Sequence, residues 1–478
     1  TKWLITVIGI LTLGGGYTIA LTTESPLEAL LLFFIAVILV IIGTYSLFTA
    51  GSIALLKLLR KNRNFYYKAG HFISVSGMMY RMKRNAAGLA NICILSTMVL
   101  VMISTTVCMY VGVEDALVYR FPNDISFSVA LDHPVTPEEV RNILLEEVER
   151  SALAPELIYD YTSLSFSVDA NVSVLEANEV NYSYKSEYVT VLTAEEYKKL
   201  TGSDIGPEKG QVMAVSLVRP YSWDSVTILG NKYSIAQWLD DFPFDGGYYN
   251  AYVNDAFVFI VPDKQDLEAI CAAQIDAYGD HASSYVWSIG IDLDGSDEDI
   301  RSCYASMLSA LSKNRPYSYS YTDSSGAELT AEYHVSQSLC RQAAADEFYS
   351  LYGGLLFLGL FLGALFLMAT VLIIYYKQIS EGYEDKERYE IMQKIGMSRD
   401  EVKTSIRSQI LTVFFLPLAG AIVHLAAAFK MITKLMLVLN LSNIVLFAVC
   451  TLGTIIVFAV VYAVVYSLTA RTYYKIVG

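Results

Sequence analysis

The histidine and serine residues of this sequence form no recognisable catalytic motif. The sequence contains no H-E-x-x-H zinc spacing, no G-x-S-x-G nucleophile elbow and no G-x-x-x-x-G-K-S/T phosphate loop. The five histidines are far apart along the chain: His71, His133, His281, His334 and His424. We therefore predict that this chain is not an enzyme, and that it has no catalytic residue, metal site or bound cofactor of its own.

One acidic run superficially resembles a calcium-binding loop. Its aspartates are Asp292, Asp294, Asp297 and Asp299, with Gly295 among them. The glycine is out of place for an EF-hand, and no glutamate occupies the closing position. Ser296 followed by Asp299 has the spacing of a helix cap, so we favour a strand that leads into a capped helix.

The most informative spacing lies in the charged run 377–407, between two apolar segments near the C-terminus. Acidic residues at 384–385 suit a helix start, so we expect a short helix to open at Tyr383. Gly396 predicts its end, because only glycine enters the left-handed conformation cheaply. Ser398 to Glu401 then fits a capping box that opens a second helix. An ordinary loop between two spans is the alternative.

The run E-R-Y-E-I-M-Q-K-I-G-M-S-R-D-E-V, residues 387–402, closely resembles the cytoplasmic coupling helix of FtsX-like ABC transporter permeases. The resemblance extends from about Ser74 to the C-terminus, and within the family it is strongest to the bacitracin-export type. It implies that a helix at about 383–396 docks onto a separate cytoplasmic ABC ATPase, a dimer that would bind ATP and Mg²⁺. The residues to which it assigns this coupling are Glu387, Arg388, Glu390, Ile391, Lys394, Ile395, Gly396, Met397, Ser398 and Arg399.

The resemblance also implies a role in resistance to, or sensing of, cell-wall-directed peptide antibiotics. The expected ligand is a peptide antibiotic or a lipid-linked cell-wall precursor, and a sensor histidine kinase is a further expected partner. The alternatives are an FtsX-type scaffold that activates extracellular cell-wall hydrolases, and a lipoprotein or macrolide extrusion permease. The family pattern has ten spans, so we expect this chain, which begins at Thr1 inside an apolar segment, to be N-terminally truncated.

Six apolar segments are about as long as the roughly 20 residues that cross a bilayer. We expect spans at 3–21, 29–56, 86–113, 348–376, 408–429 and 443–468. Gly359 and Gly363 form a G-x-x-x-G pair that permits close helix packing, although the motif is common by chance. Pro417 predicts a kink. His424 lies deep in the fifth span, where we expect a neutral imidazole hydrogen-bonded to a neighbouring helix rather than a functional ionisable group.

The charges are unevenly distributed along the chain. Residues 114–347 carry 39 acids against 14 bases, whereas the remainder carries 9 acids against 20 bases. The positive-inside rule then places the acidic middle outside and both visible termini in the cytoplasm of a bacterial cell. Lys430 and Lys434 are exceptions, because this topology places them outside. An acidic domain would repel phosphates, so we exclude nucleic acid as a partner.

The predicted fold is an α-helical integral membrane protein with six visible spans and an inserted extracellular α/β (α+β) domain. Residues 1–113 would hold three spans and a basic cytoplasmic loop, 114–347 the extracellular domain, and 348–478 an FtsX-like unit with three spans. The stripe from Phe72 to Ala86 predicts a helix lying in the membrane interface, and an extension of the next span is the alternative.

Within residues 114–347 the patterns mix helices and strands. We expect strands at 188–192, 211–217, 225–229, 256–261 and 289–293, and helices at 136–151, 297–312 and 331–347, the last continuing into the fourth span. The three cysteines here are an odd number without C-x-x-C spacing, so we expect free thiols at Cys271, Cys303 and Cys340.

Overall fold

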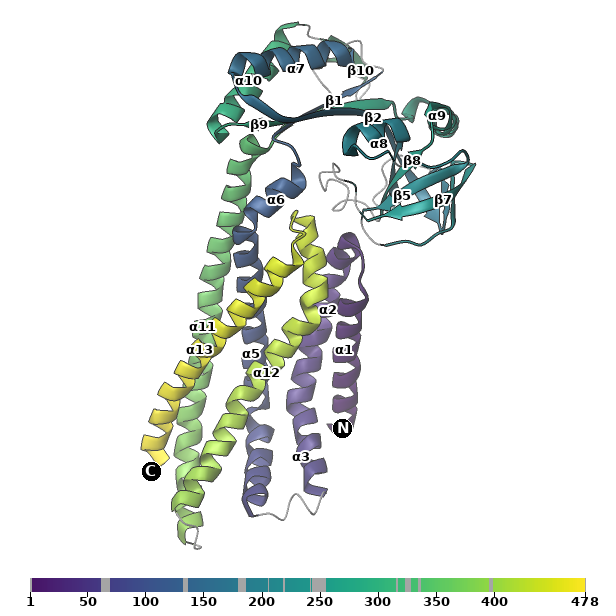
Figure 1. Cartoon of the computed structure of the whole chain (residues 1–478). Coiled ribbons are helices and arrows are strands. Elements are labelled where there is room, and N and C mark those ends of the chain that lie inside the picture. Colours follow the sequence, from purple (N-terminus) through teal and green to yellow (C-terminus); the bar gives the residue numbers. More distant parts are fainter. Residues whose placement is uncertain are drawn as a thin grey trace.

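The structure is a computed structural model of the chain. It describes residues 2–61, 69–131, 136–178, 186–204, 206–217, 220–240, 242, 255–314, 317–322, 328–333, 337–394 and 399–477. A long bundle of helices carries a sheet-containing domain at one end, and both chain termini lie at the other end (Figure 1). We call these the sheet-proximal end and the far end of the bundle.

Six helices in the described residues are long and apolar enough to cross a membrane. The number and order predicted from the sequence are therefore confirmed. Between α2 and α3 the chain forms a π-helical turn, η1, so these elements make one continuous candidate span. The bundle consists of α1 (Lys2–Thr22), α2 (Pro26–Ser46), η1 (Leu47–Gly51), α3 (Ser52–Lys61), α5 (Ala69–Val111), α11 (Arg341–Lys394), α12 (Arg399–Val438) and α13 (Ile444–Val477).

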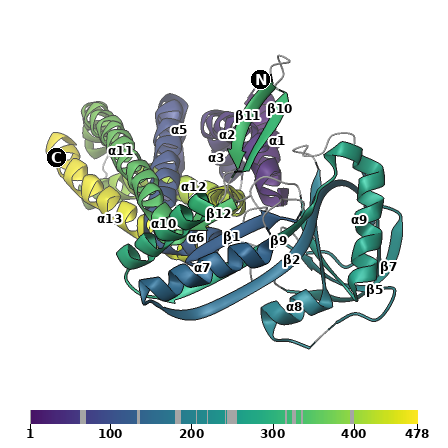
Figure 2. The same cartoon turned by 90° about the horizontal axis from the view of Figure 1, so that it is seen from above.

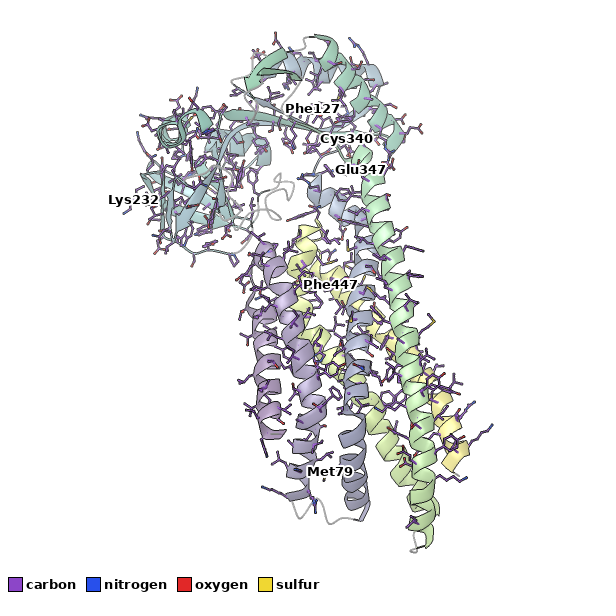
Figure 3. All side chains as sticks on the ribbon, turned by 180° about the vertical axis from the view of Figure 1, so that it is seen from behind. Met79, Phe127, Lys232, Cys340, Glu347 and Phe447 are labelled. Atoms are coloured by element: carbon purple, nitrogen blue, oxygen red, sulfur yellow. The ribbon has the colours of Figure 1, made fainter. Side chains whose placement is uncertain are left out.

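Helix α5 continues well beyond the apolar segment that predicted it. Its 43 residues include the stripe from Phe72 to Ala86 without a break. The structure thus agrees with the alternative interpretation, an extension of the third span, and not with a separate interfacial helix. Met79 lies near the far end of the bundle (Figure 3) and packs against its apolar core.

Helix α11 is the longest element of the molecule. It has 54 residues, which at 1.5 Å per residue is a rod of about 81 Å. Two predictions are corrected here. No separate helix opens at Tyr383, because that residue lies inside α11, and the helix predicted for 331–347 begins only at Arg341. Of the residues before it, 331–333 and 337–340 lie in strands instead, and β12 (Gln337–Cys340) pairs with an edge of the main sheet.

The G-x-x-x-G pair of α11 faces α5. A Cβ atom built on Gly359 would lie 2.4 Å from Thr106 Oγ1, and one on Gly363 would lie 2.9 Å from Ile103 Cδ1. These two positions therefore allow α5 and α11 to approach more closely than any side chain would permit. Helix α12 continues through Pro417 without a break in its helical assignment.

The sheet domain is built on one ten-stranded sheet with the order β12-β1-β9-β2-β3-β6-β7-β5-β8-β4. The long strand β2 pairs with β9 along its first part and with β4 along its second, so the strands from β2 to β4 close on themselves. The strands of the main sheet are β1 (Ile125–Ala130), β2 (Ala154–Asn171), β3 (Val174–Glu176), β4 (Glu187–Thr193), β5 (Gln211–Ser216), β6 (Ser225–Ile228), β7 (Asn231–Leu239), β8 (Ala256–Val261), β9 (Tyr285–Asp294) and β12.

Short helices cover this sheet and connect it to the bundle. Helices α7 and α10 lie on one face (Figure 2), where they bury the apolar alternation of β1 and β9. The strands β10 (Tyr317–Thr322) and β11 (Glu328–Tyr333) form a separate hairpin. The remaining elements are α6 (Val113–Arg120), α7 (Pro137–Ser151), α8 (Ala194–Thr201), α9 (Lys264–Tyr278), η2 (Gly279–His281) and α10 (Asp297–Asn314).

The local signals of the sequence are confirmed in this domain. All five predicted strands are present, with ends shifted by a few residues. Thr136 forms a capping box with Glu139 at the start of α7, and Thr193 caps α8. All cysteines are free, and burial raises the pKa of the Cys303 and Cys340 thiols, so both are poor nucleophiles.

We expect Gly359→Ala to lower the melting temperature of the detergent-purified protein, because the added methyl group overlaps Thr106 and costs about 1–3 kcal/mol. Gly354→Ala is the matched control on the same helix, since a Cβ there meets nothing within 4 Å. Thermal unfolding of both variants checks the prediction. Equal melting temperatures would show that α5 and α11 do not pack as described.

Candidate functional site

The predicted coupling residues lie at the far end of the bundle, where α11 ends and α12 begins (Figure 1). The backbone is helical from Glu387 through Lys394, and Arg399 is the first residue of α12. Ile391 is 54% exposed, so more than half of this large apolar side chain is accessible at the surface. The predicted glycine corner and cap fall on residues outside the described ones: Ile395, Gly396, Met397 and Ser398.

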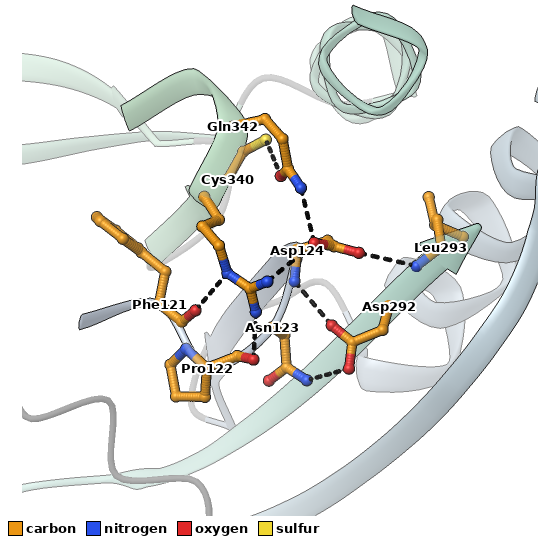
Figure 4. A network of polar contacts seen from close by, with 9 residues as sticks. Phe121, Pro122, Asn123, Asp124, Asp292, Leu293, Cys340 and Gln342 are labelled. Carbon is orange, nitrogen blue, oxygen red and sulfur yellow. Dashed lines mark hydrogen bonds and ion pairs between the residues drawn. The ribbon is translucent and has the colours of Figure 1, made fainter. Parts of the chain in front are cut away.

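The opposite end of α11 joins the sheet domain at a compact polar junction (Figure 4). Strand β12 passes directly into α11, with Cys340 the last residue of the strand and Arg341 the first of the helix. Strand β1 follows α6 after only four residues and pairs with β12. The two connections between bundle and sheet domain therefore lie side by side.

Arg341 binds the connection between α6 and β1 through its whole guanidinium group. Its Nε donates to the carbonyl oxygen of Phe121 at 2.7 Å, and one terminal nitrogen donates to the carbonyl oxygen of Pro122. The other terminal nitrogen lies 3.3 Å from Asp124 Oδ1. The backbone N–H of Arg341 also donates to the Asp124 carbonyl, at 2.9 Å. One residue thus closes both connections together.

Asp124 is the centre of the junction. Its buried carboxylate accepts from Gln342 Nε2 at 2.7 Å and from the backbone N–H of Leu293 at 3.0 Å, in addition to Arg341. Its own backbone N–H donates to Asp292 Oδ1 at 2.8 Å. A buried carboxylate is stable only when paired and hydrogen-bonded, and here the donors come from β9 and α11 at once.

A second layer supports these contacts from the sheet. Asn123 donates from Nδ2 to Asp292 Oδ2 at 3.1 Å, and it accepts a hydrogen bond from the Tyr159 hydroxyl. Burial raises the pKa of Tyr159, which keeps its hydroxyl a donor. Gly290 has no space for a side chain, because a Cβ there would lie 2.5 Å from Tyr159 Cζ. The sequence did not indicate this glycine, since its neighbours come from distant strands.

The acidic run that resembled a calcium loop contributes to two separate structural features, the junction and a helix cap. Asp292 belongs to the junction. Ser296 accepts from the backbone N–H of Asp299 at 3.3 Å and donates to its carboxylate at 2.6 Å, so the predicted helix cap is confirmed.

The sheet-proximal ends of the bundle helices are tied together by further polar contacts. Lys430 binds Glu24 at 2.6 Å and the carbonyl of Leu21 at 3.0 Å, which joins α12 to the α1–α2 turn. Asn443, just before α13, donates to Asp115 of α6 at 2.7 Å. Lys430, an exception in the predicted topology, therefore has an acidic partner at the sheet-proximal end.

His424 connects three bundle helices, as expected for a neutral imidazole in a span. Its Nε2 lies 3.0 Å from Thr44 Oγ1, and its Nδ1 lies 2.6 Å from the Tyr17 hydroxyl. Because Thr44 donates its hydroxyl hydrogen to Val40 O, its oxygen must accept from Nε2–H. Tyr17 then donates to Nδ1, and each hydrogen in the group has a partner.

No known protein-family model matches the chain. It is similar to the ABC transporter permease protein YxdM of Bacillus subtilis (strain 168), with 23% identity over 89% of this chain and 62% of that protein. It also resembles the bacitracin export permease protein BceB of the same organism, with 22% identity over 80% of this chain and 55% of BceB. The BceB protein of Halalkalibacterium halodurans is 24% identical over 88% of this chain and 61% of its own length.

These relatives are all ABC transporter permeases, which supports that family for this chain. The chain spans about three fifths of the length of the curated relatives it matches.

We expect Arg341→Met to destabilise the protein by about 2–3 kcal/mol, because the buried Asp124 carboxylate loses its cation and two carbonyls lose a donor. The control is Arg301→Met, which removes an exposed ion pair between α10 and Asp346 of α11, expected to contribute less than about 1 kcal/mol. Thermal unfolding compares the two. Equal melting temperatures of the two variants would show that the Arg341 contacts do not stabilise the connection between the bundle and the sheet domain.

Proposed function

We propose that this chain is the permease subunit of an ABC transporter, which couples ATP hydrolysis by a separate ATPase subunit to the handling of an extracellular or membrane-bound substrate. The observation that carries this proposal is the continuity of α11. One uninterrupted helix runs from the predicted coupling residues to the Arg341–Asp124 junction of the sheet domain.

The distribution of charge supports an orientation across the bacterial cell membrane. Among the residues that the structure describes, several basic side chains lie at the far end. They are Lys57, Arg60 and Lys61 of α3, and Arg471 and Lys475 of α13. The acidic residues 114–347 form the other end. With the positive-inside rule, we infer that the termini and the coupling segment are cytoplasmic and that the sheet domain is extracellular.

A continuous helix transmits motion because its backbone hydrogen bonds resist bending and stretching. In our proposal, closure of the ATPase dimer displaces the far end of α11, and the opposite end moves the sheet domain through Arg341. ATP and Mg²⁺ would be bound by the ATPase, since this chain has no phosphate-binding loop. The exposed Ile391 would supply apolar contact area at the ATPase surface.

The substrate class is proposed from the relatives. Two of them are named bacitracin export permeases. We therefore propose that this chain takes part in resistance to a cell-wall-directed peptide antibiotic, and that its ligand is the peptide or the lipid-linked precursor that such peptides bind. A sensor histidine kinase is a further proposed partner.

We expect Ile391→Ala to weaken co-purification of the ATPase about tenfold without changing the melting temperature, because this side chain is more than half exposed. Glu390→Ala and Gly396→Ala should likewise reduce ATP hydrolysis by the complex while the protein stays folded. The control is Tyr376→Ala, an exposed residue of α11 that lies before residues 383–396. Normal assembly and activity in all three variants would contradict the assignment of this segment.

We expect deletion of the gene in its host to sensitise the cells to one or more cell-wall-directed peptides, measured as a fall in minimum inhibitory concentration across a panel. An unrelated antibiotic and cell morphology serve as controls. Unchanged susceptibility together with chained or misshapen cells would contradict the antibiotic role and favour a scaffold that activates cell-wall hydrolases.

A further inference from the structure

The far end of α11 has a buried polar face that lies just before the coupling residues. Gln378, Glu381 and Asp385 recur at three- and four-residue steps, so they share one side of the helix. All three are less than one-tenth exposed. Carboxylates remain buried only where other groups hold them by hydrogen bonds or charge, so this face requires a specific neighbour.

The neighbour is the C-terminal helix α13, which lies beside the far end of α11 (Figure 1). Tyr473 of α13 is 1% exposed, and its ring lies against Gly382. A Cβ at Gly382 would lie 3.3 Å from Tyr473 Cδ2, which is closer than an ordinary van der Waals contact. It would lie 3.5 Å from Ile476 Cβ, which is an ordinary contact distance. The glycine thus allows the aromatic ring to pack directly on the backbone of α11.

The same tyrosine also makes a directional contact. Its hydroxyl donates to Asp385 Oδ2 at 2.7 Å, and the bond is buried. Gly382 and Asp385 are three residues apart, so the ring and the hydroxyl contact the same face about one turn apart. A two-point contact of this kind restricts rotation of α11 about its axis, as well as its separation from α13.

A cavity of about 30 Å³ lies next to this contact, lined by Lys377, Gln378, Glu381 and Tyr473 among others. The space is about the size of one water molecule. The packing between α11 and the apolar core is therefore interrupted just above the coupling segment. Tyr473 both lines this cavity and contacts Gly382 and Asp385, which follow Glu381 toward the coupling segment.

We propose that Tyr473 is a positioning residue for coupling. It locks the last turns of α11 against α13, and so sets the orientation in which residues 387–394 meet the ATPase. The inference rests on the proposed function and extends it to α13, a helix outside the coupling motif. Asp385 is two residues before Glu387, so the locked turn leads directly into the segment.

The contact of Tyr473 with Gly382 and Asp385, which we call the lock, is tested by amide hydrogen exchange of the full chain in lipid nanodiscs. Mass spectrometry then follows exchange in peptides covering 383–394. We expect Tyr473→Phe to accelerate exchange in this segment about tenfold, because it removes the hydrogen bond to the buried Asp385 carboxylate and keeps the aromatic ring. The matched control is Tyr462→Phe on the same helix, whose hydroxyl donates to the Phe414 carbonyl of α12 at 2.8 Å. The control should leave exchange at 383–394 unchanged.

A double-mutant cycle isolates the pair. Asp385→Asn keeps an acceptor oxygen for Tyr473, so it should accelerate exchange less than Tyr473→Phe does. In the Tyr473→Phe background it should add little, because the contact is already lost. The proposal would be contradicted if Tyr473→Phe left the exchange rate unchanged. It would also be contradicted if the effects of Tyr473→Phe and Asp385→Asn on exchange were additive in the double mutant.

ATP hydrolysis by the intact complex, purified through a tag on this chain, then tests the role of the lock. We expect Tyr473→Phe to lower it several-fold and Tyr462→Phe to leave it near the wild-type rate. If exchange accelerates but hydrolysis and assembly are unchanged, Tyr473 locks the helix without positioning it for coupling. If the Ile391→Ala complex also remains fully active, the proposed function of the segment fails as well.

Discussion

A lipid bilayer offers no hydrogen-bond partners to a polypeptide backbone, and this constraint shapes the whole molecule. Each crossing must be a continuous helix, because an interrupted one would leave amide and carbonyl groups unsatisfied in hydrocarbon. Helix α11 is much longer than the roughly 20 residues that a crossing needs, and it extends from Arg341 at one end to Lys394 at the other. The sheet domain and the predicted coupling segment are thereby joined by a single stiff element.

A stiff helix transmits motion only if both of its ends are held. At the sheet domain the Asp124 carboxylate gathers donors from α11 and β9, and Arg341 closes the connection from α6. At the far end the Tyr473 hydroxyl meets Asp385. Both attachments use a buried carboxylate, whose need for donors is strong and directional. Apolar packing such as that at Gly359 aligns the helix between them without fixing its ends as specifically.

The two helix starts that the sequence predicted wrongly, at residue 331 and at Tyr383, have a common physical cause. Residues 331–340 contain enough helix-compatible side chains to suggest a helix, but β12 is a strand because β1 presents an open edge to it. Tyr383 and the acids after it suit a helix start, yet α11 is already helical there and has no reason to end. In both cases the local pattern was consistent with the prediction, and a contact or a continuation from elsewhere in the chain decided the outcome.

The sequence alone determined the six apolar helices, five strands of the sheet domain and the helix cap at Ser296, because these depend on residues close together in the chain. It also indicated the coupling segment by its motif. Only the tertiary structure revealed the junction at Asp124 and Arg341 and the contact between Asp385 and Tyr473. Asp124 and Arg341 are 217 residues apart, and Asp385 and Tyr473 are 88 apart. No periodicity connects such residues, since their proximity is created by the packing of whole helices and sheets.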